Sequence, residues 1–214
     1  YLEDEGKIFS NYFGEVSNPK RQSLLPKYVR DSDLEKMFHV FSMDDALGQR
    51  NTLLLEMLYA TGVRVSELVG IRISDINLYD KTIHILGKGR KERVVFFGTY
   101  CDNVLRVYLE DGYKILNQKK SGYLFLNKFG DVLSTRYVRK VIDDAVLRCG
   151  IEYHISPHTL RHTFATDMLN QGADLMTVKE LLGHSSVNTT GIYTHVSNER
   201  LRQVYEFAHP RGKE

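Results

Sequence analysis

The sequence predicts a mostly α-helical fold with a small antiparallel β-sheet. Most of the chain shows the three-to-four-residue apolar spacing of amphipathic helices. Two short segments, 81–86 and 92–97, instead alternate in polarity or are rich in β-branched and aromatic residues, which is typical of strands. The sequence shows no internal repeat and no low-complexity tract, so we expect an ordinary globular arrangement of these elements.

The first helices are expected soon after an extended, basic segment. Asp31 or Ser32 can cap a helix that directly follows them. A longer helix over 45–61 is so densely apolar that we expect it to be central, and Gly62 suits its C-cap. A short helix is predicted over 65–69.

In the middle of the chain the spacing of apolar residues changes from helical to strand-like. Segments 81–86 and 92–97 flank the basic, glycine-containing stretch 87–91, and this pattern indicates a β-hairpin. Helix is expected again over about 100–116. The short apolar run 123–126 is predicted to be a strand.

Four helical segments are predicted to finish the chain. Each is preceded by a polar residue that can accept a hydrogen bond from the first helical turn. The expected N-caps are Ser134, Ser156, Asp174 and Ser197. The first three helices are expected to end near Cys149, Gly172 and Gly183.

Composition excludes several classes of protein. Of 214 residues, 29 are Lys or Arg and 27 are Asp or Glu, so the formal net charge is +2, and 42% are hydrophobic. These values exclude intrinsic disorder. No apolar run approaches the roughly 18 residues that a membrane span requires, so no membrane partner is expected. Cys101 and Cys149 lack metal-site spacing and favour a reducing compartment.

The chain divides into three expected parts. Residues 1–17 have mixed polarity and are interpreted as the end of a preceding region. Residues 18–28 contain two prolines and several basic side chains, which predicts an extended interdomain linker. Residues 29–214 are expected to form the main domain.

Two short motifs can bind an anion. His158 and Arg161 lie three residues apart near the start of a predicted helix, where backbone N–H groups and the helix dipole favour negative charge. Arg64 opens another helix, with Glu67 three residues later as its ion-pair partner. Taken alone, the first motif favours a solvated helix surface, and the second is also compatible with a simple surface salt bridge. His158 and His162 lack a third metal ligand nearby, so we expect neither a metal nor a cofactor.

The full ordered set resembles a known family. Arg64, Lys88, His158-x-x-Arg161, His184 and Tyr193 stand in Thr-Gly-Val-Arg-Val-Ser-Glu-Leu, Gly-Lys-Gly-Arg-Lys-Glu-Arg, Pro-His-Thr-Leu-Arg-His-Thr-Phe-Ala-Thr, Leu-Leu-Gly-His-Ser-Ser and Ile-Tyr-Thr-His. These motifs resemble the tyrosine recombinase (phage-integrase) family, especially its Xer-type and mobile-element branch. The resemblance covers about residues 19–207 and implies the family's catalytic-domain fold, with residues 1–17 as the remnant of an N-terminal DNA-binding domain.

The resemblance implies site-specific cleavage and rejoining of duplex DNA through a 3′-phosphotyrosyl intermediate, without metal or ATP. Such a reaction serves integration or excision of a mobile element, or resolution of DNA dimers. The implied roles are Tyr193 as nucleophile, Arg64 and Arg161 as clamps on the phosphate oxygens, His158 as general base, His184 as phosphate donor, Lys88 as general acid and Glu67 as orienting residue.

The resemblance also implies partners. These are duplex DNA and other recombinase subunits, four on two sites, in the cytoplasm at the nucleoid. Further basic residues are candidates for DNA contact: Arg90, Lys91, Arg93, Arg136, Arg139 and Lys140. The last helix, near 197–208, carries an apolar stripe of Leu201, Val204, Tyr205 and Ala208. This stripe either packs on its own domain or, as the resemblance implies, docks on a neighbouring subunit.

Three alternatives stay open. A type IB topoisomerase-like relaxer uses a similar tyrosine but acts without sequence preference. A recombinase-derived factor could bind DNA without cutting, although Tyr193 and both arginines are present. A metal hydrolase would require bound zinc.

Overall fold

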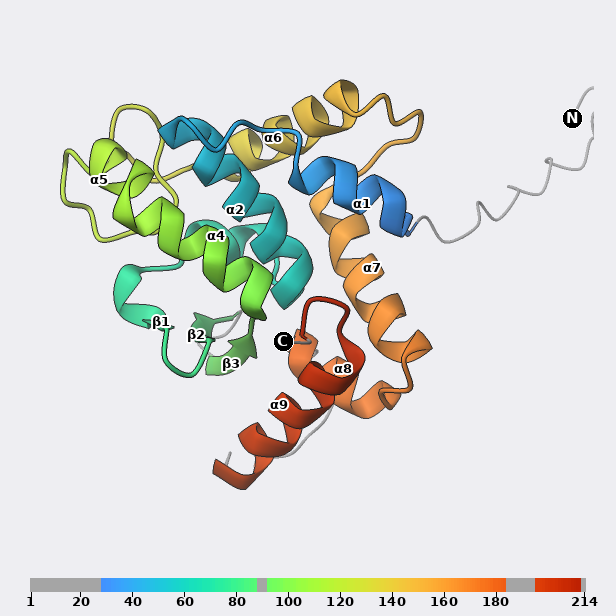
Figure 1. Ribbon diagram of the computed structural model, residues 1–214. Helices are drawn as coiled ribbons and strands as arrows, with labels where there is room; N and C mark the ends of the chain where they lie inside the picture. The colour runs from blue at the N-terminus through green and yellow to red at the C-terminus, as the bar shows by residue number, and fades with distance from the viewer. Residues whose placement is uncertain (1–27, 88–91, 184–194, 213–214) are drawn as a thin grey trace, which may run out of the picture.

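The computed structural model describes residues 28–87, 92–183 and 195–212. In these ranges the helices form most of the domain, and a small sheet lies at one edge of it (Figure 1). The helices are α1 (Asp31–Phe38), α2 (Ala46–Thr61), α3 (Val65–Val69), the 3-10 turn η1 (Ile73–Asp75), α4 (Thr99–Glu110), α5 (Gly112–Leu116), α6 (Thr135–Arg148), α7 (Pro157–Asn170), α8 (Leu175–Leu182) and α9 (His195–Ala208). The strands are β1 (Ile76–Asn77), β2 (Thr82–Leu86) and β3 (Glu92–Phe96). The predicted fold class is confirmed.

Helix α2 is the centre of the domain. Its N-cap is Asp45, whose carboxylate accepts hydrogen bonds from the backbone N–H groups of Leu47 and Gly48. Every residue from Thr52 to Thr61 is buried, because α4, α5 and α7 pack around the helix (Figure 1). It ends at Gly62, which has a φ of 59° and therefore a conformation that favours glycine. The predicted central helix and its glycine C-cap are confirmed.

The sheet is antiparallel, in the order β1-β2-β3. Strands β2 and β3 form the predicted hairpin, with Ile83 opposite Val95 and Ile85 opposite Arg93. The two-residue strand β1 was not predicted, because it is too short to show a period. The predicted strand 123–126 was wrong, because this segment makes only isolated bridges, one of them between Arg72 and Tyr123.

Most helix boundaries follow from local caps. Ser134, Ser156 and Asp174 accept hydrogen bonds from the first turns of α6, α7 and α8, as predicted. The predicted helix 100–116 is divided at Asp111 into α4 and α5. Helix α9 begins at His195, so Ser197 lies within it and is not its N-cap.

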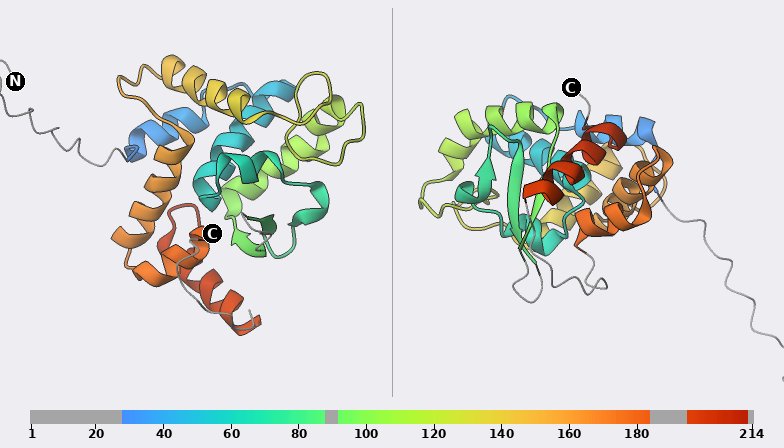
Figure 2. Two further views of the ribbon diagram at one scale, coloured as in Figure 1. Left: turned by 180° about the vertical axis from the view of Figure 1, so that it is seen from behind. Right: turned by 90° about the horizontal axis from the view of Figure 1, so that it is seen from below.

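The apolar stripe of α9 packs on its own domain. Leu201, Tyr205 and Ala208 are buried in a second core cluster that includes Phe164 and Met168 of α7. Figure 2 shows α9 running beside β3, and contacts to α7 and α8 complete this interface. In this chain the stripe therefore packs within its own domain, and docking on a neighbouring subunit stays a prediction.

The expected linker lies almost wholly outside the described residues. Packing of the domain is already established at Val29, which is fully buried and whose N–H donates to the Thr163 hydroxyl at 2.9 Å. The three-part division stays a prediction. In the described parts of the chain, no helix is long and apolar enough to span a membrane.

Candidate active site

Arg64 is held at the turn between α2 and α3. Its backbone N–H donates to Glu67 Oε2 at 2.8 Å, and its Nη1 donates to Glu67 Oε1 at 2.9 Å. Glu67 thus caps α3 and orients the guanidinium at once. The Arg64 side chain is 37% exposed, whereas that of Glu67 is only 5% exposed. A buried carboxylate therefore holds a cation that can reach solvent.

Arg161 approaches the same turn from α7. Its Nη1 donates to the Gly62 carbonyl oxygen, and its Nη2 donates to the Leu182 carbonyl oxygen at 2.7 Å. The residue is buried, and burial together with the nearby Arg64 and Arg93 charges lowers its pKa to about 10. Arg161 is still charged at neutral pH. It ties the turn that carries Arg64 to the end of α8.

Arg93 is the third guanidinium at this point. Its Nη1 and Nη2 donate to Glu67 Oε1 and Oε2 at 3.1 and 2.8 Å, a two-point ion pair. Its side chain is only 9% exposed. We expected Arg93 to contact DNA, but its guanidinium is engaged by Glu67 inside the domain. DNA contact by Arg93 stays a prediction without support from this geometry.

Three cations around one carboxylate set the electrostatics of the site. Burial acts to raise the pKa of Glu67, but the hydrogen bonds from Arg93 and from the Arg64 backbone outweigh it and lower the pKa to about 2. Glu67 is therefore ionised at any working pH. The cluster keeps an excess of positive charge, which favours an anion such as a phosphodiester.

His158 lies on the first turn of α7. The turn is fixed by Ser156 and Thr159, whose side chains each accept a hydrogen bond from the other's backbone N–H. The His158 side chain is exposed, while Arg161, three residues later, is buried. The structure thus places an imidazole at the solvent side of the helix that carries Arg161.

Several predicted site residues lie outside the described residues. They are Lys88, Arg90, Lys91, His184 and Tyr193. The segments that flank them meet each other, because Arg93 Nε of β3 donates to the Leu181 carbonyl oxygen of α8 at 3.3 Å. Arg93, which also binds Glu67, therefore links the described ends of β3 and α8.

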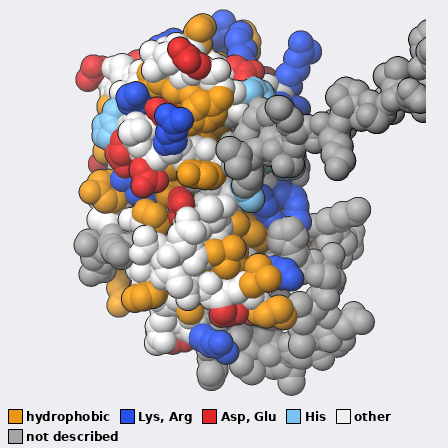
Figure 3. All heavy atoms as spheres, turned by 90° about the vertical axis from the view of Figure 1, so that its right-hand side faces the viewer, with side chains coloured by type: hydrophobic (Ala, Val, Ile, Leu, Met, Phe, Trp, Pro, Cys, Tyr) orange, Lys and Arg blue, Asp and Glu red, His pale blue; other side chains and the backbone are white. Residues whose placement is uncertain are grey.

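The remaining DNA-contact candidates lie on α6. Arg136, Arg139 and Lys140 are all exposed. On the face shown in Figure 3, Lys and Arg side chains form separate groups among acidic and apolar ones, in keeping with the small net charge. The role of these residues in binding DNA stays a prediction.

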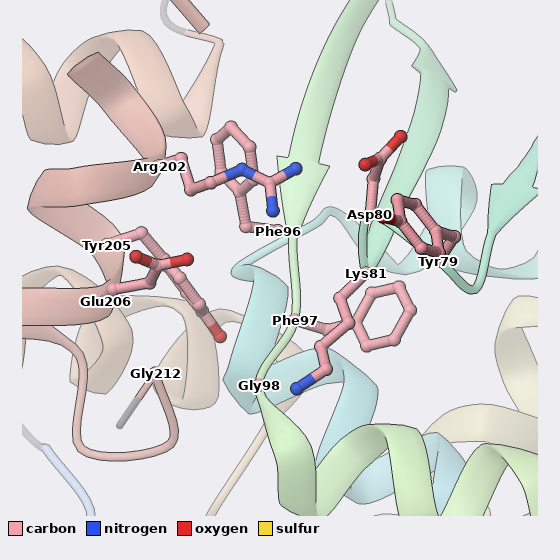
Figure 4. Close-up of a pocket in the computed structure, with 10 residues that line it drawn as sticks. All are labelled: Tyr79, Asp80, Lys81, Phe96, Phe97, Gly98, Arg202, Tyr205, Glu206 and Gly212. Carbon is pink, nitrogen blue, oxygen red and sulfur yellow. The ribbon is translucent and has the colours of Figure 1, made fainter. Parts of the chain in front are cut away.

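Neither a metal-binding cluster nor the cavity that the described residues form provides an alternative reaction centre. Among the described residues, no group of three or more His, Cys, Asp or Glu side chains could hold a metal ion. A cavity of about 120 Å³ lies between β3 and α9, where Arg202 covers the Phe96 ring (Figure 4). None of the three site arginines lines this cavity.

Comparison with known protein sequences shows the family to which this chain belongs. The model of the phage integrase family matches residues 27–200. Tyrosine recombinase XerC of Oceanobacillus iheyensis is 44% identical over 215 residues, which cover 99% of this chain and 70% of that protein. XerC of Staphylococcus aureus strain JH9 is 47% identical over 203 residues, 95% of this chain and 68% of that protein. The chain therefore belongs to the phage integrase family, and its class of enzyme is the tyrosine recombinases.

Solved structures give the same fold. XerA recombinase matches with a TM-score of 0.68 and 34% identity over 87% of this chain and 66% of its own. XerH recombinase, in a post-cleavage complex with its difH substrate, matches with a TM-score of 0.67 and 32% identity over 87% of this chain and 54% of its own. The chain thus spans between half and two thirds of these recombinases. The predicted tyrosine recombinase catalytic-domain fold is confirmed.

Proposed function

We propose that this chain cuts and rejoins duplex DNA at specific sites through a 3′-phosphotyrosyl intermediate. The observation that carries the proposal is the arrangement of Arg64 and Arg161 around one turn, with His158 on the same helix as Arg161. Family membership supports it, as does the XerH structure, which was obtained with a DNA substrate after cleavage.

The chemistry follows from the charges. Tyr193 attacks the scissile phosphorus, and the 3′-phosphotyrosine preserves the energy of the broken bond, so no ATP is needed. A tyrosine hydroxyl has an ordinary pKa of about 10, so it requires a base, which we assign to His158. Arg64 and Arg161 stabilise the charge that grows on the nonbridging oxygens.

The other roles complete the cycle. Lys88 protonates the 5′-oxygen as it leaves, and His184 donates to a phosphate oxygen. Glu67 orients Arg64, through the hydrogen bonds described above. In rejoining, the 5′-hydroxyl attacks the phosphotyrosine, and the same groups act in reverse.

We propose duplex DNA and further recombinase subunits as partners, four subunits on two sites, acting at the nucleoid in the cytoplasm. Docking of α9 on a neighbour requires it to leave its own core cluster, since Leu201, Tyr205 and Ala208 are buried there. The biological purpose, either resolution of DNA dimers or movement of an element, depends on the DNA site.

Covalent capture tests the proposal. The protein is incubated with DNA from the source replicon in EDTA, the reaction is stopped in SDS, and protein-linked fragments are recovered and sequenced. We expect adducts at one recurrent site from the wild type and none from Tyr193→Phe. Tyr79→Phe is the matched control, because Tyr79 is 94% exposed and should form adducts as the wild type does.

Other outcomes would favour the alternatives. Adducts at random sequences with relaxation of supercoiled DNA would indicate a topoisomerase-like relaxer. Specific binding without adducts would indicate a factor that does not cut. Adducts that disappear in EDTA would indicate metal-dependent chemistry and contradict the proposed mechanism.

A further inference from the structure

We propose that Arg93 is a positioning residue for DNA cleavage, because it locks the carboxylate that orients Arg64 and anchors the turn that precedes His184. The inference rests on the proposed function. It replaces the expected contact of Arg93 with DNA by a role inside the protein.

The first argument is the geometry around Glu67. Each carboxylate oxygen accepts two hydrogen bonds: Oε1 from Arg64 Nη1 at 2.9 Å and Arg93 Nη1 at 3.1 Å, and Oε2 from the Arg64 N–H and Arg93 Nη2, both at 2.8 Å. A planar guanidinium bound at both oxygens prevents the carboxylate from rotating. The direction in which Glu67 holds Arg64 is therefore fixed by Arg93.

The second argument is burial. The side chains of Glu67 and Arg93 are 5% and 9% exposed, whereas that of Arg64 is 37% exposed. The two buried partners form the support, and the exposed partner is the one that can reach a phosphate. Arg93 itself has no comparable access to DNA.

The third argument is the place of Arg93 in the sheet. Arg93 stands opposite Ile85, and Val95 stands opposite Ile83. Cross-strand pairs share a face of the sheet, and Ile83, Ile85 and Val95 are buried. The register thus directs Arg93 inward, so the strand that follows the Lys88 hairpin is fastened to α3.

The fourth argument is the end of α8. Arg93 Nε donates to the Leu181 carbonyl oxygen at 3.3 Å, and Arg161 Nη2 donates to the next carbonyl, that of Leu182, at 2.7 Å. Gly183 follows with a φ of 66°, and a Cβ there would lie 2.9 Å from Arg93 Cδ. Two guanidiniums therefore cap consecutive carbonyls at the negative end of the helix, directly before His184.

The test uses Arg93→Met and Arg93→Lys. The substrate is a nicked suicide duplex with the site found by covalent capture, and single-turnover cleavage is measured at increasing protein concentration. For Arg93→Met we expect a rate constant about 100-fold lower, since small misplacements of a catalytic group have such effects. The half-saturating concentration should change less than about threefold, because Arg93 does not touch DNA. Arg93→Lys keeps the charge but cannot bind both carboxylate oxygens in the same way, so its cleavage rate constant should be about tenfold lower than that of the wild type.

A second substrate separates positioning from general damage. A methylphosphonate at the scissile position is neutral, so it has less charge for Arg64 to stabilise. On the methylphosphonate substrate, the cleavage rate constant of Arg93→Met should be less than about threefold below that of the wild type. Arg148→Met is the matched control, because Arg148 is an exposed arginine paired with Asp144 and should cleave both substrates as the wild type does.

Three results would overturn the proposal. They are unchanged cleavage by Arg93→Met, an equal deficit on both substrates, and weakened DNA binding with an unchanged rate. Should Arg93→Met not fold, Arg93→Lys carries the same comparison between the two substrates.

A measurement without DNA keeps this inference distinct from the proposed function. In the free protein, carboxyl ¹³C NMR follows the ionisation of Glu67 from pH 7 down to the pH at which the fold is lost, and its hydrogen bonds hold its pKa at about 2 in the wild type. Loss of the Arg93 hydrogen bonds should raise that pKa, and an unchanged value would refute the role of Arg93. A wild type that forms no DNA adducts would instead contradict the proposed function itself.

Discussion

The buried histidine after α9 should make the fold sensitive to acid. His209 is fully buried, its ring stacks on Tyr205 with centroids 5.0 Å apart at 10°, and it contacts Tyr59 and Phe164. Its Nδ1 accepts a hydrogen bond from the Arg211 N–H at 3.0 Å, so the neutral ring carries its proton on Nε2. Burial, aided by the Arg211 charge, lowers the pKa of His209 to about 3.

The magnitude follows from linkage. In the unfolded chain the pKa of His209 returns to 6.5, so below that pH the unfolded state binds the proton and the folded state does not. The stability contributed by the neutral ring is complete above pH 6.5 and declines as the pH falls toward 3. Each pH unit in this window amounts to about 1.4 kcal/mol, so between pH 7 and 4.5 the loss is about 3 kcal/mol.

His209→Asn removes the titration while keeping a polar acceptor near Nδ1. At pH 7 the variant should be less stable by about 3 kcal/mol, because a buried ring is lost. At pH 4.5 that difference should fall close to zero. Urea unfolding of both proteins at several pH values measures it, and other titrating groups cancel in the difference.

His154→Asn is the control for this comparison. His154 is exposed, so replacing it should change the free energy of unfolding little. A difference between wild type and His209→Asn that stayed constant from pH 7 to 4.5 would show that the buried site tolerates the imidazolium, and would refute the reasoning.

Three further predictions concern the same domain. In Gly98→Ala the new Cβ would lie 1.5 Å from the Arg211 carbonyl oxygen. We therefore expect the free energy of unfolding in urea to fall by at least about 2 kcal/mol and the C-terminus to be cleaved faster by proteases. Gly70→Ala is the control, because the nearest atom to its new Cβ is at 3.4 Å, and its stability should stay within about 0.5 kcal/mol of the wild type. Burial raises the pKa of Glu56 to about 7 despite the attraction of Arg211. The contribution of Glu56 to the stability of the fold is therefore complete below pH 4.5 and declines by about 3 kcal/mol as the pH rises to 7. Glu56→Gln should abolish this decline when unfolding in urea is measured at pH 5 and at pH 7.5. Arg161→Met leaves two carbonyl oxygens without their hydrogen-bond donor, so it should lower the free energy of unfolding by about 2 to 4 kcal/mol. It should also reduce the formation of DNA adducts more than about 100-fold, and normal adduct formation would contradict the proposed role of Arg161 in cleavage.

Local signals predicted most helices. Asp45, Ser134, Ser156 and Asp174 act on N–H groups only two or three residues away, so the sequence contains the whole interaction. The same holds for Arg64 and Glu67, which are three residues apart on α3. This is why the pairing of Arg64 with Glu67 could be predicted from the sequence.

Long-range contacts account for what the sequence could not show. The break at Asp111 arises because Gln49 of α2 donates to the Asp111 carboxylate at 2.7 Å and accepts from the Gly112 N–H at 2.9 Å. The segment 123–126 is not a strand because its backbone is bound by other parts of the chain, such as Tyr108, whose hydroxyl donates to the Leu124 carbonyl oxygen. Neither contact has a local signature.

The partner of Arg93 was hidden for a similar reason, although one signal was available. Glu67 lies far from Arg93 in sequence, and a basic residue beside a basic turn indicates a contact with DNA. The hairpin register, however, could be aligned from its two strands, and it places Arg93 opposite the apolar Ile85. An arginine on the inward face of a strand requires a buried carboxylate partner, and Glu67 is the one that the structure supplies.

A chain with a net charge of only +2 can still present a strongly cationic site, because the charges are arranged and not merely abundant. Burial lowers the pKa of Arg161, repulsion from Arg64 and Arg93 lowers it further, and one carboxylate cannot neutralise all three charges. The carbonyl oxygens of Gly62, Leu181 and Leu182 accept hydrogen bonds from two of these guanidiniums and hold them in place. A phosphodiester that entered beside Arg64 would relieve this repulsion. In the mechanism that we propose, the fold would therefore supply the positive charge for phosphoryl transfer, with arginine side chains that are already held in place by Glu67 and by backbone carbonyl oxygens.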